Sequence, residues 1–102
     1  MIFRRRAQFG ELVERQLELV RRDDADLWEA MGAAERAYDA AERDEAEEHY
    51  GDYLLAVEAC ADRLSEVRDG YARTLDGGAA DEYREAFDRT AARRWKALSI
   101  EL

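Results

Sequence analysis

The single histidine and single cysteine of this 102-residue chain are the first candidates for chemistry, because both side chains can act near neutral pH. Cys60 falls at an apolar helix position eleven residues after His49, so we expect it to be buried as a small apolar side chain and not paired with His49. The serines and threonines have no histidine within reach to serve as a base. We therefore expect a protein that is not an enzyme.

His49 has carboxylates on its own helical face, with Glu45 four residues before it and Asp52 three residues after it. Such a set could hold a metal ion. Ferritin-like di-iron bundles, however, need two Glu-x-x-His motifs and two further glutamates, and this chain has no such motif. We interpret His49 as a surface histidine and predict no cofactor, with Glu45, His49 and Asp52 kept as the alternative metal site.

Aromatic residues at helix positions suggest contacts more than catalysis. Tyr50, Tyr53 and Tyr71 could line a ligand slot between helices, but the simpler interpretation is a helical core with the hydroxyls at its rim. Trp28 lies beside the first apolar stripe, where a large ring could anchor a dimer or a third helix. Together with Asp24, discussed below, Trp28, Tyr50 and Tyr53 are the predicted interaction residues.

These residues must be positioned by helices, because two segments carry apolar residues in alternating steps of four and three. The first segment reads Val13, Leu17, Val20, Asp24, Leu27, Met31, Ala34, Tyr38 and Ala41, and the second reads Ala46, Tyr50, Tyr53, Val57, Cys60, Leu64, Val67 and Tyr71. The two patterns are out of phase across residues 42–45, so we predict a turn there. The result is a long antiparallel hairpin of helices at about 7–42 and 44–76, with a capping box at Asp44 and Glu47.

Asp24 is the one polar member of the first pattern. A lone acid between helices destabilises the fold unless it is paired, and Arg63 or Arg68 on the facing helix could supply the pair. We expect Asp24 to fix the helix register. The aspartates within residues 23–26 could instead cap a separate helix near Leu27, but the unbroken pattern favours a continuous helix with at most a kink.

A third helix is predicted at about 79–97, after Asp76-Gly77-Gly78, which we expect to end the second helix in left-handed backbone. Its apolar stripe consists of Tyr83, Phe87, Ala91, Trp95 and Leu98. We predict an all-α three-helix bundle that forms one domain over residues 1–102. The basic start at 1–6 is expected to be disordered.

Residues 44–50 resemble the start of the second helix of a tetratricopeptide repeat, and Ala34, Ala46 and Tyr50 match the pattern of that family. The turn glycine of the repeat is Ala41 here, and no second copy follows thirty-four residues later, which excludes a solenoid. The resemblance implies a turn near residue 43 and no more.

Charge is divided unevenly along the chain, whose net charge is −9. Residues 1–22 carry +3, residues 23–82 carry −14 and residues 83–102 carry +2. In a hairpin this gathers acid at the turn and base near both termini, so a basic protein could dock at the turn, although a solvated surface is the simpler interpretation. The three arginines at 4–6 lack interleaved aromatics, and we expect neither nucleic acid nor membrane as a partner.

The remaining features concern setting and assembly. One cysteine, no apolar run of signal-peptide length and no membrane-length segment favour the cytoplasm, and fifteen arginines against one lysine suggest a GC-rich bacterial genome. Each hairpin arm would be about 50 Å long, more than the third helix covers, so we expect two copies to pair. The predicted function is self-association or protein–protein docking, with a small-molecule or metal-binding bundle as the alternative.

Overall fold

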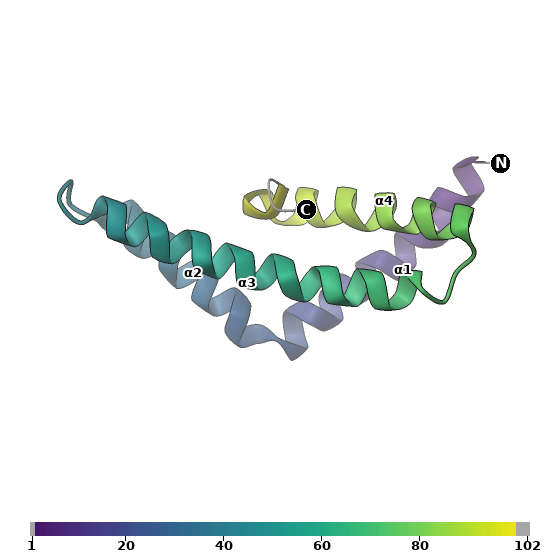
Figure 1. Ribbon diagram of the computed structural model, residues 1–102, viewed down its shortest axis with the longest axis horizontal. Helices are drawn as coiled ribbons and strands as arrows, with labels where there is room; N and C mark the ends of the chain where they lie inside the picture. Colours follow the sequence, from purple (N-terminus) through teal and green to yellow (C-terminus); the bar gives the residue numbers. More distant parts are fainter. Residues whose placement is uncertain (1, 100–102) are drawn as a thin grey trace.

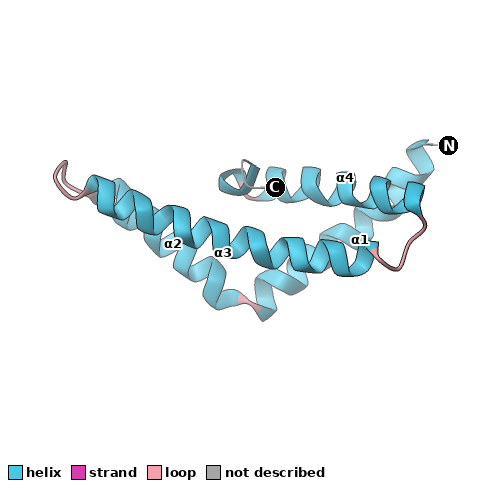
Figure 2. Ribbon diagram, in the orientation of Figure 1, coloured by secondary structure: helices cyan, strands magenta, loops and turns pink. Residues whose placement is uncertain are grey.

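The elements of the molecule are helices throughout residues 2–99, which a computed structural model describes, with side chains from Phe9 to Leu98. Figures 1 and 2 show α1 (Ile2–Asp23), α2 (Ala25–Ala40), α3 (Ala46–Ala72), α4 (Gly77–Arg94) and the short 3-10 helix η1 (Lys96–Ser99). The predicted all-α fold is confirmed, and no strand occurs in this part of the chain. The number of helices differs from the prediction, because four α-helices replace the expected three.

The predicted first arm at 7–42 is wrong, because it is two helices that meet at Asp24. The backbone there leaves helical geometry, with φ −110° and ψ 40°. The Asp24 N–H still donates to the Val20 carbonyl at 2.8 Å, while the Leu27 N–H donates to the Asp24 carbonyl at 3.0 Å. Neither Asp24 nor any residue near Leu27 caps the second helix through its side chain, since α2 starts at Ala25 without a side-chain cap.

The break lets the two halves pack on different partners. α2 lies along α3, whereas α1 swings away from the α2 direction and lies along α4 (Figure 1). The heptad pattern continues across Asp24 because each half needs an apolar stripe for its own partner. A continuous pattern therefore did not require a continuous helix.

The predicted hairpin turn is confirmed, since residues 41–45 separate α2 from α3. The predicted capping box at Asp44 and Glu47 is wrong, because Glu45 occupies the cap position of α3 without a side-chain cap bond. The Glu45 N–H instead donates to the Glu42 carbonyl at 2.9 Å, so a tight backbone turn makes the connection.

The connection between α3 and α4 differs from the prediction in the backbone conformation of its glycines. α3 ends at Ala72, and the Thr74 and Leu75 N–H groups donate to the Tyr71 and Ala72 carbonyls at 2.9 and 3.0 Å. These short-range bonds already satisfy the end of the helix, so no left-handed residue is needed. Gly77 and the residue after it have negative φ and begin α4.

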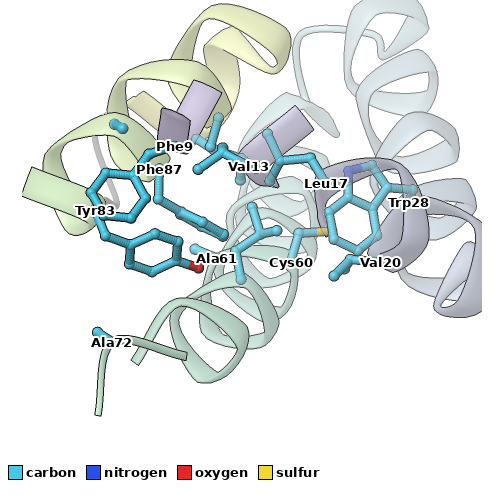
Figure 3. Close-up of a cluster of buried hydrophobic side chains, with 14 of the residues drawn as sticks. Phe9, Val13, Leu17, Val20, Trp28, Cys60, Ala61, Ala72, Tyr83 and Phe87 are labelled. Carbon is cyan, nitrogen blue, oxygen red and sulfur yellow. The ribbon is translucent and has the colours of Figure 1, made fainter. Parts of the chain in front are cut away.

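The core fills the space between α1, α3 and α4 and extends to α2. Tyr83, Phe87 and Ala91 of α4 are fully buried, as the predicted stripe requires, and Leu98 of η1 is buried with them. Figure 3 shows the core continuing from these rings through Val13 and Leu17 of α1 to Trp28 of α2. The other core members are Phe9, Val20, Met31, Val57, Cys60, Ala61, Leu64, Ala72, Ala80 and Ala86.

The outline is elongated, about 54 Å long and 23 by 18 Å across. The α2–α3 turn forms one end, and α1 begins near the other (Figure 1). α4 runs back along α3, so its basic end at Arg93 and Arg94 lies near mid-length and not at the pole where we expected it. We use the term distal hairpin for residues 32–56, which lie between Met31, the last buried residue of α2, and Val57, the first buried residue of α3.

Two further expectations concern the ends and the membrane. α1 has helical backbone from Ile2 onward, and the disordered start expected at 1–6 stays a prediction. Residues 2–9 contain no proline or glycine to stop it. None of the helices in the described range 2–99 is long and apolar enough to cross a bilayer.

Candidate functional site

The side of α3 that faces the core continues past the end of α4. Val57, Ala61 and Leu64 are buried on this side. Tyr50 lies seven residues before Val57, and Leu54 lies seven before Ala61, so both point in the same direction as the covered residues. Their side chains are nevertheless 45% and 43% exposed. Tyr50 and Leu54 are more exposed because α4 and η1 end before they reach the distal hairpin (Figure 1).

α2 shows the same transition from covered to open. Trp28 is buried against Trp95, with ring centroids 5.2 Å apart, so this face of α2 points toward the end of α4. Glu35 and Asp39 lie seven and eleven residues after Trp28 and therefore share its face. Both carboxylates are exposed. The open part of this face on α2 is acidic.

The outer edge of the open surface on α3 is acidic as well. Glu47 lies seven residues before Leu54 and Glu58 lies four after it, which places both beside Leu54. Both are exposed, and within residues 9–98 neither takes part in an ion pair. No lysine or arginine occurs between Asp44 and Asp62.

These residues define the candidate site, which we call the distal face. It consists of apolar Tyr50 and Leu54 between two acidic edges, and its members are Glu35, Asp39, Glu47, Tyr50, Leu54 and Glu58. Exposed apolar groups bordered by charge are the usual composition of a protein-binding surface. The distal face lacks a buried nucleophile or base that could turn over a substrate.

A tyrosine cluster supports the distal face from below. Tyr38 of α2 packs on Tyr50 and Tyr53 of α3, with ring centroids 5.2 and 6.4 Å apart. Burial raises the pKa of Tyr53, and the nearby carboxylates of Glu35 and Asp39 raise it further. Tyr53 therefore stays protonated at neutral pH. Of the three rings that could have lined a ligand slot, Tyr50 and Tyr53 thus pack on Tyr38 between α2 and α3, and Tyr71 packs on Tyr83 of α4 with centroids 4.8 Å apart.

Two of the predicted interaction residues make contacts within the chain. Trp28 packs on Trp95, and this contact with the predicted third helix is one of the two roles expected of it. Because Trp28 is buried, it is not available to a partner protein. The Asp24 carboxylate accepts a hydrogen bond from Arg63 Nε at 3.0 Å, the first of the two predicted pairings. The Asp24 side chain is 28% exposed, so it lies at the rim of the core and not inside it.

Arg68, the other candidate partner of Asp24, connects α3 to α4 instead. Its guanidinium donates to Asp88 at 2.7 Å and to Asp69 at 2.9 Å. The Arg68 hydrogen bond and charge lower the pKa of Asp69, and Arg84 at 3.5 Å adds to this effect. These residues hold the covered half of α3 against α4 and are structural.

The alternative metal site is not assembled. Glu45 precedes α3, and its backbone carbonyl accepts from the His49 N–H at 3.2 Å. His49 is half-buried, whereas Asp52 is exposed on the next turn. Across the described residues, no group of three histidine, cysteine or carboxylate side chains is placed to hold a metal ion.

No family model, no curated protein and no solved structure matches this chain. The distal face is therefore judged by its own residues.

A surface depression that is separate from the distal face lies between α1 and α4. Arg94 pairs with Glu14 across it at 3.3 Å, and Arg93 Nη2 lies 3.4 Å from Thr90 Oγ1. The charged side chains of this depression are therefore either paired with one another or of both signs, and few apolar groups line it. The lining residues are Gly10, Glu11, Glu14, Arg15, Glu18, Thr90 and Arg93. This composition gives no preference for a ligand class, unlike the distal face.

Sequence reasoning found part of the distal face. It placed Tyr50 on the helix-pairing stripe, and it expected a length of hairpin that the third helix could not reach. It missed Glu35 and Asp39, because the side of α2 that carries them is identified only by the contact of Trp28 with Trp95. The spacing of seven and eleven residues from Trp28 was available, but nothing in the sequence identified Trp28 as the reference point.

Proposed function

We propose that this chain is a non-catalytic docking protein that binds another protein through the distal face. The observation that supports this most is the continuation of the core-facing side of α3 into exposed Tyr50 and Leu54. On the covered half, the same side buries Val57, Ala61 and Leu64. A helix side that the rest of the chain covers along half its length and leaves open along the other half is suited to receive a further element.

The distal face is also where two copies would meet if the chain pairs with itself, as the length of the hairpin leads us to expect. Size-exclusion chromatography with light scattering at micromolar concentration tests this pairing. A dimer that Leu54→Glu dissociates supports self-association through the distal face. A monomer leaves docking to a different protein as the function.

Affinity capture from the organism of origin, with wild type and two variants, tests the docking role. Leu54→Glu places a charge within the distal face, whereas Leu19→Glu places the same charge at a 39% exposed leucine on α1. We expect a partner, or a second copy, that wild type and Leu19→Glu retain and Leu54→Glu loses. If all three proteins behave alike in capture and in light scattering, the distal face is not a docking surface.

A further inference from the structure

We propose that the partner at the distal face is a basic amphipathic helix from another protein, an inference that rests on the docking role proposed above. α4 packs on α1 and on the proximal part of α3, and it buries one apolar stripe of Tyr83, Phe87 and Ala91 in doing so. A helix placed further along the core-facing side of α3 would meet Tyr50 and Leu54.

The size of the open surface sets the length of the partner. From the start of α3 at Ala46 to the first covered residue, Val57, the helix extends over eleven residues, or about 17 Å at ~1.5 Å per residue. A partner helix of about three to four turns would span it. Apolar side chains at positions i, i+3 or i+4 and i+7 would contact Tyr50 and Leu54.

The charges on the two edges set the sign of the partner. Glu35 and Asp39 lie along the α2 edge, and Glu47 and Glu58 lie along the α3 edge. A helix lying between the edges would direct the residues that flank its apolar stripe toward both of them. Lysine or arginine at those flanking positions would meet carboxylates on each side, which speeds association and rejects acidic helices.

The same charges argue against a second copy as the occupant of the distal face, although the length of the hairpin led us to expect that two copies pair. A two-fold dimer formed through the distal face would place the acidic edges of one copy against those of the other. Like charges in such proximity oppose association. The distal hairpin contains two arginines, Arg36 and Arg43, against eight aspartates and glutamates, so little basic charge is available nearby to offset this repulsion.

Fluorescence anisotropy with a synthetic helix tests the proposal. The probe is a labelled 14-residue peptide with leucine at every third or fourth position and lysine elsewhere. Two control peptides replace every lysine by glutamate or place a proline at the centre to prevent helix formation. We expect saturable binding of the lysine peptide and at least tenfold weaker binding of both controls.

Matched protein variants separate contact at the distal face from general attraction to an acidic protein. Glu47→Lys with Glu58→Lys changes the distal face, and Glu11→Lys with Glu18→Lys makes the same change in net charge on α1. We expect the first pair, and Leu54→Glu, to weaken binding at least tenfold and the second pair to change it less than about threefold. These side chains are exposed, and circular dichroism melting verifies that each variant is folded.

Several outcomes would overturn the proposal. Equal weakening by the two charge-reversal pairs would mean that net charge alone attracts the peptide. Equal binding of the proline peptide would exclude a helical partner, and a wild-type dimer that Leu54→Glu dissociates would identify a second copy as the occupant. If the lysine peptide fails to bind while affinity capture still finds a Leu54-dependent partner, this inference fails and the docking role stands.

Discussion

At Cys60, burial determines the reactivity of the thiol. The side chain is fully buried, its sulfur lies 3.3 Å from the Leu27 carbonyl, and burial raises the pKa of the thiol to about 11. We expect the folded protein at pH 8 to react with a thiol reagent at least about a hundredfold more slowly than the unfolded chain, because the thiolate is the reactive species. Leu55→Cys in a Cys60→Ala background supplies an exposed control. Fast labelling of folded wild type would contradict the buried position.

The raised pKa of Tyr83 leads us to predict how stability changes at alkaline pH. Burial raises its pKa from 10.0 to about 12, and its hydroxyl donates to Gln16 Oε1 at 2.6 Å. The unfolded chain releases this proton near pH 10 and the folded chain only near 12. The stabilisation is therefore complete below pH 10 and lost as pH rises toward 12, and Cys60 acts in the same direction from pH 9 to 11.

Thermal melting from pH 8.5 to 11.5 measures this effect. We expect the melting temperature of wild type to fall with pH, and that of Tyr83→Phe to fall less steeply. The phenylalanine ring keeps the packing but leaves Gln16 without its partner, which costs about 1 kcal/mol at neutral pH. Equal slopes for the two proteins would show that Tyr83 ionises equally easily when folded and unfolded.

At the scale of elements, two arginines on α3 make ion pairs that we expect to contribute unequally to the free energy of unfolding. Arg68 connects α3 to Asp88 of α4 at 2.7 Å and is 18% exposed, whereas Arg63 reaches Asp24 at 3.0 Å and is 39% exposed. Removing the more buried charge leaves Asp88 without its partner, whereas Asp69 keeps Arg84. We expect Arg68→Ala to lower the free energy of unfolding by about 2 kcal/mol and Arg63→Ala by less than ~1 kcal/mol. Urea unfolding at pH 7 measures both, and the reverse order would contradict this account.

The helices themselves could be predicted from residue spacing, and their arrangement only in part. The stripe of Tyr83, Phe87 and Ala91 identified α4, and the phase change near residue 43 located the hairpin turn. The break at Asp24 could not be read from the pattern, because a helix that changes partners keeps the same spacing of apolar residues. A run of aspartates at 23, 24 and 26 was the local signal, since short polar side chains compete with helical hydrogen bonds.

For the whole molecule, the unequal cover of the α2–α3 hairpin should produce unequal local stability. The part of α3 from Val57 to Ala72 buries five residues beneath α1, α2 and α4, and the part from Ala46 to Ala56 buries none. Segments with few buried contacts open locally before the whole fold does. We therefore expect amides in residues 47–56 to exchange with deuterium at least about tenfold faster than those in 58–70, a difference of ~1.4 kcal/mol in opening free energy.

Hydrogen-exchange mass spectrometry at neutral pH measures this gradient and connects it with docking. A partner on the distal face would supply the cover that the chain lacks there, so exchange in residues 47–56 should slow when the lysine peptide is bound. Exchange in 58–70 should change little, because α4 already covers it. Protection confined to 58–70 would place the peptide elsewhere. Uniform exchange along free α3 would show that Tyr38, Tyr50 and Tyr53 stabilise the distal hairpin without further cover.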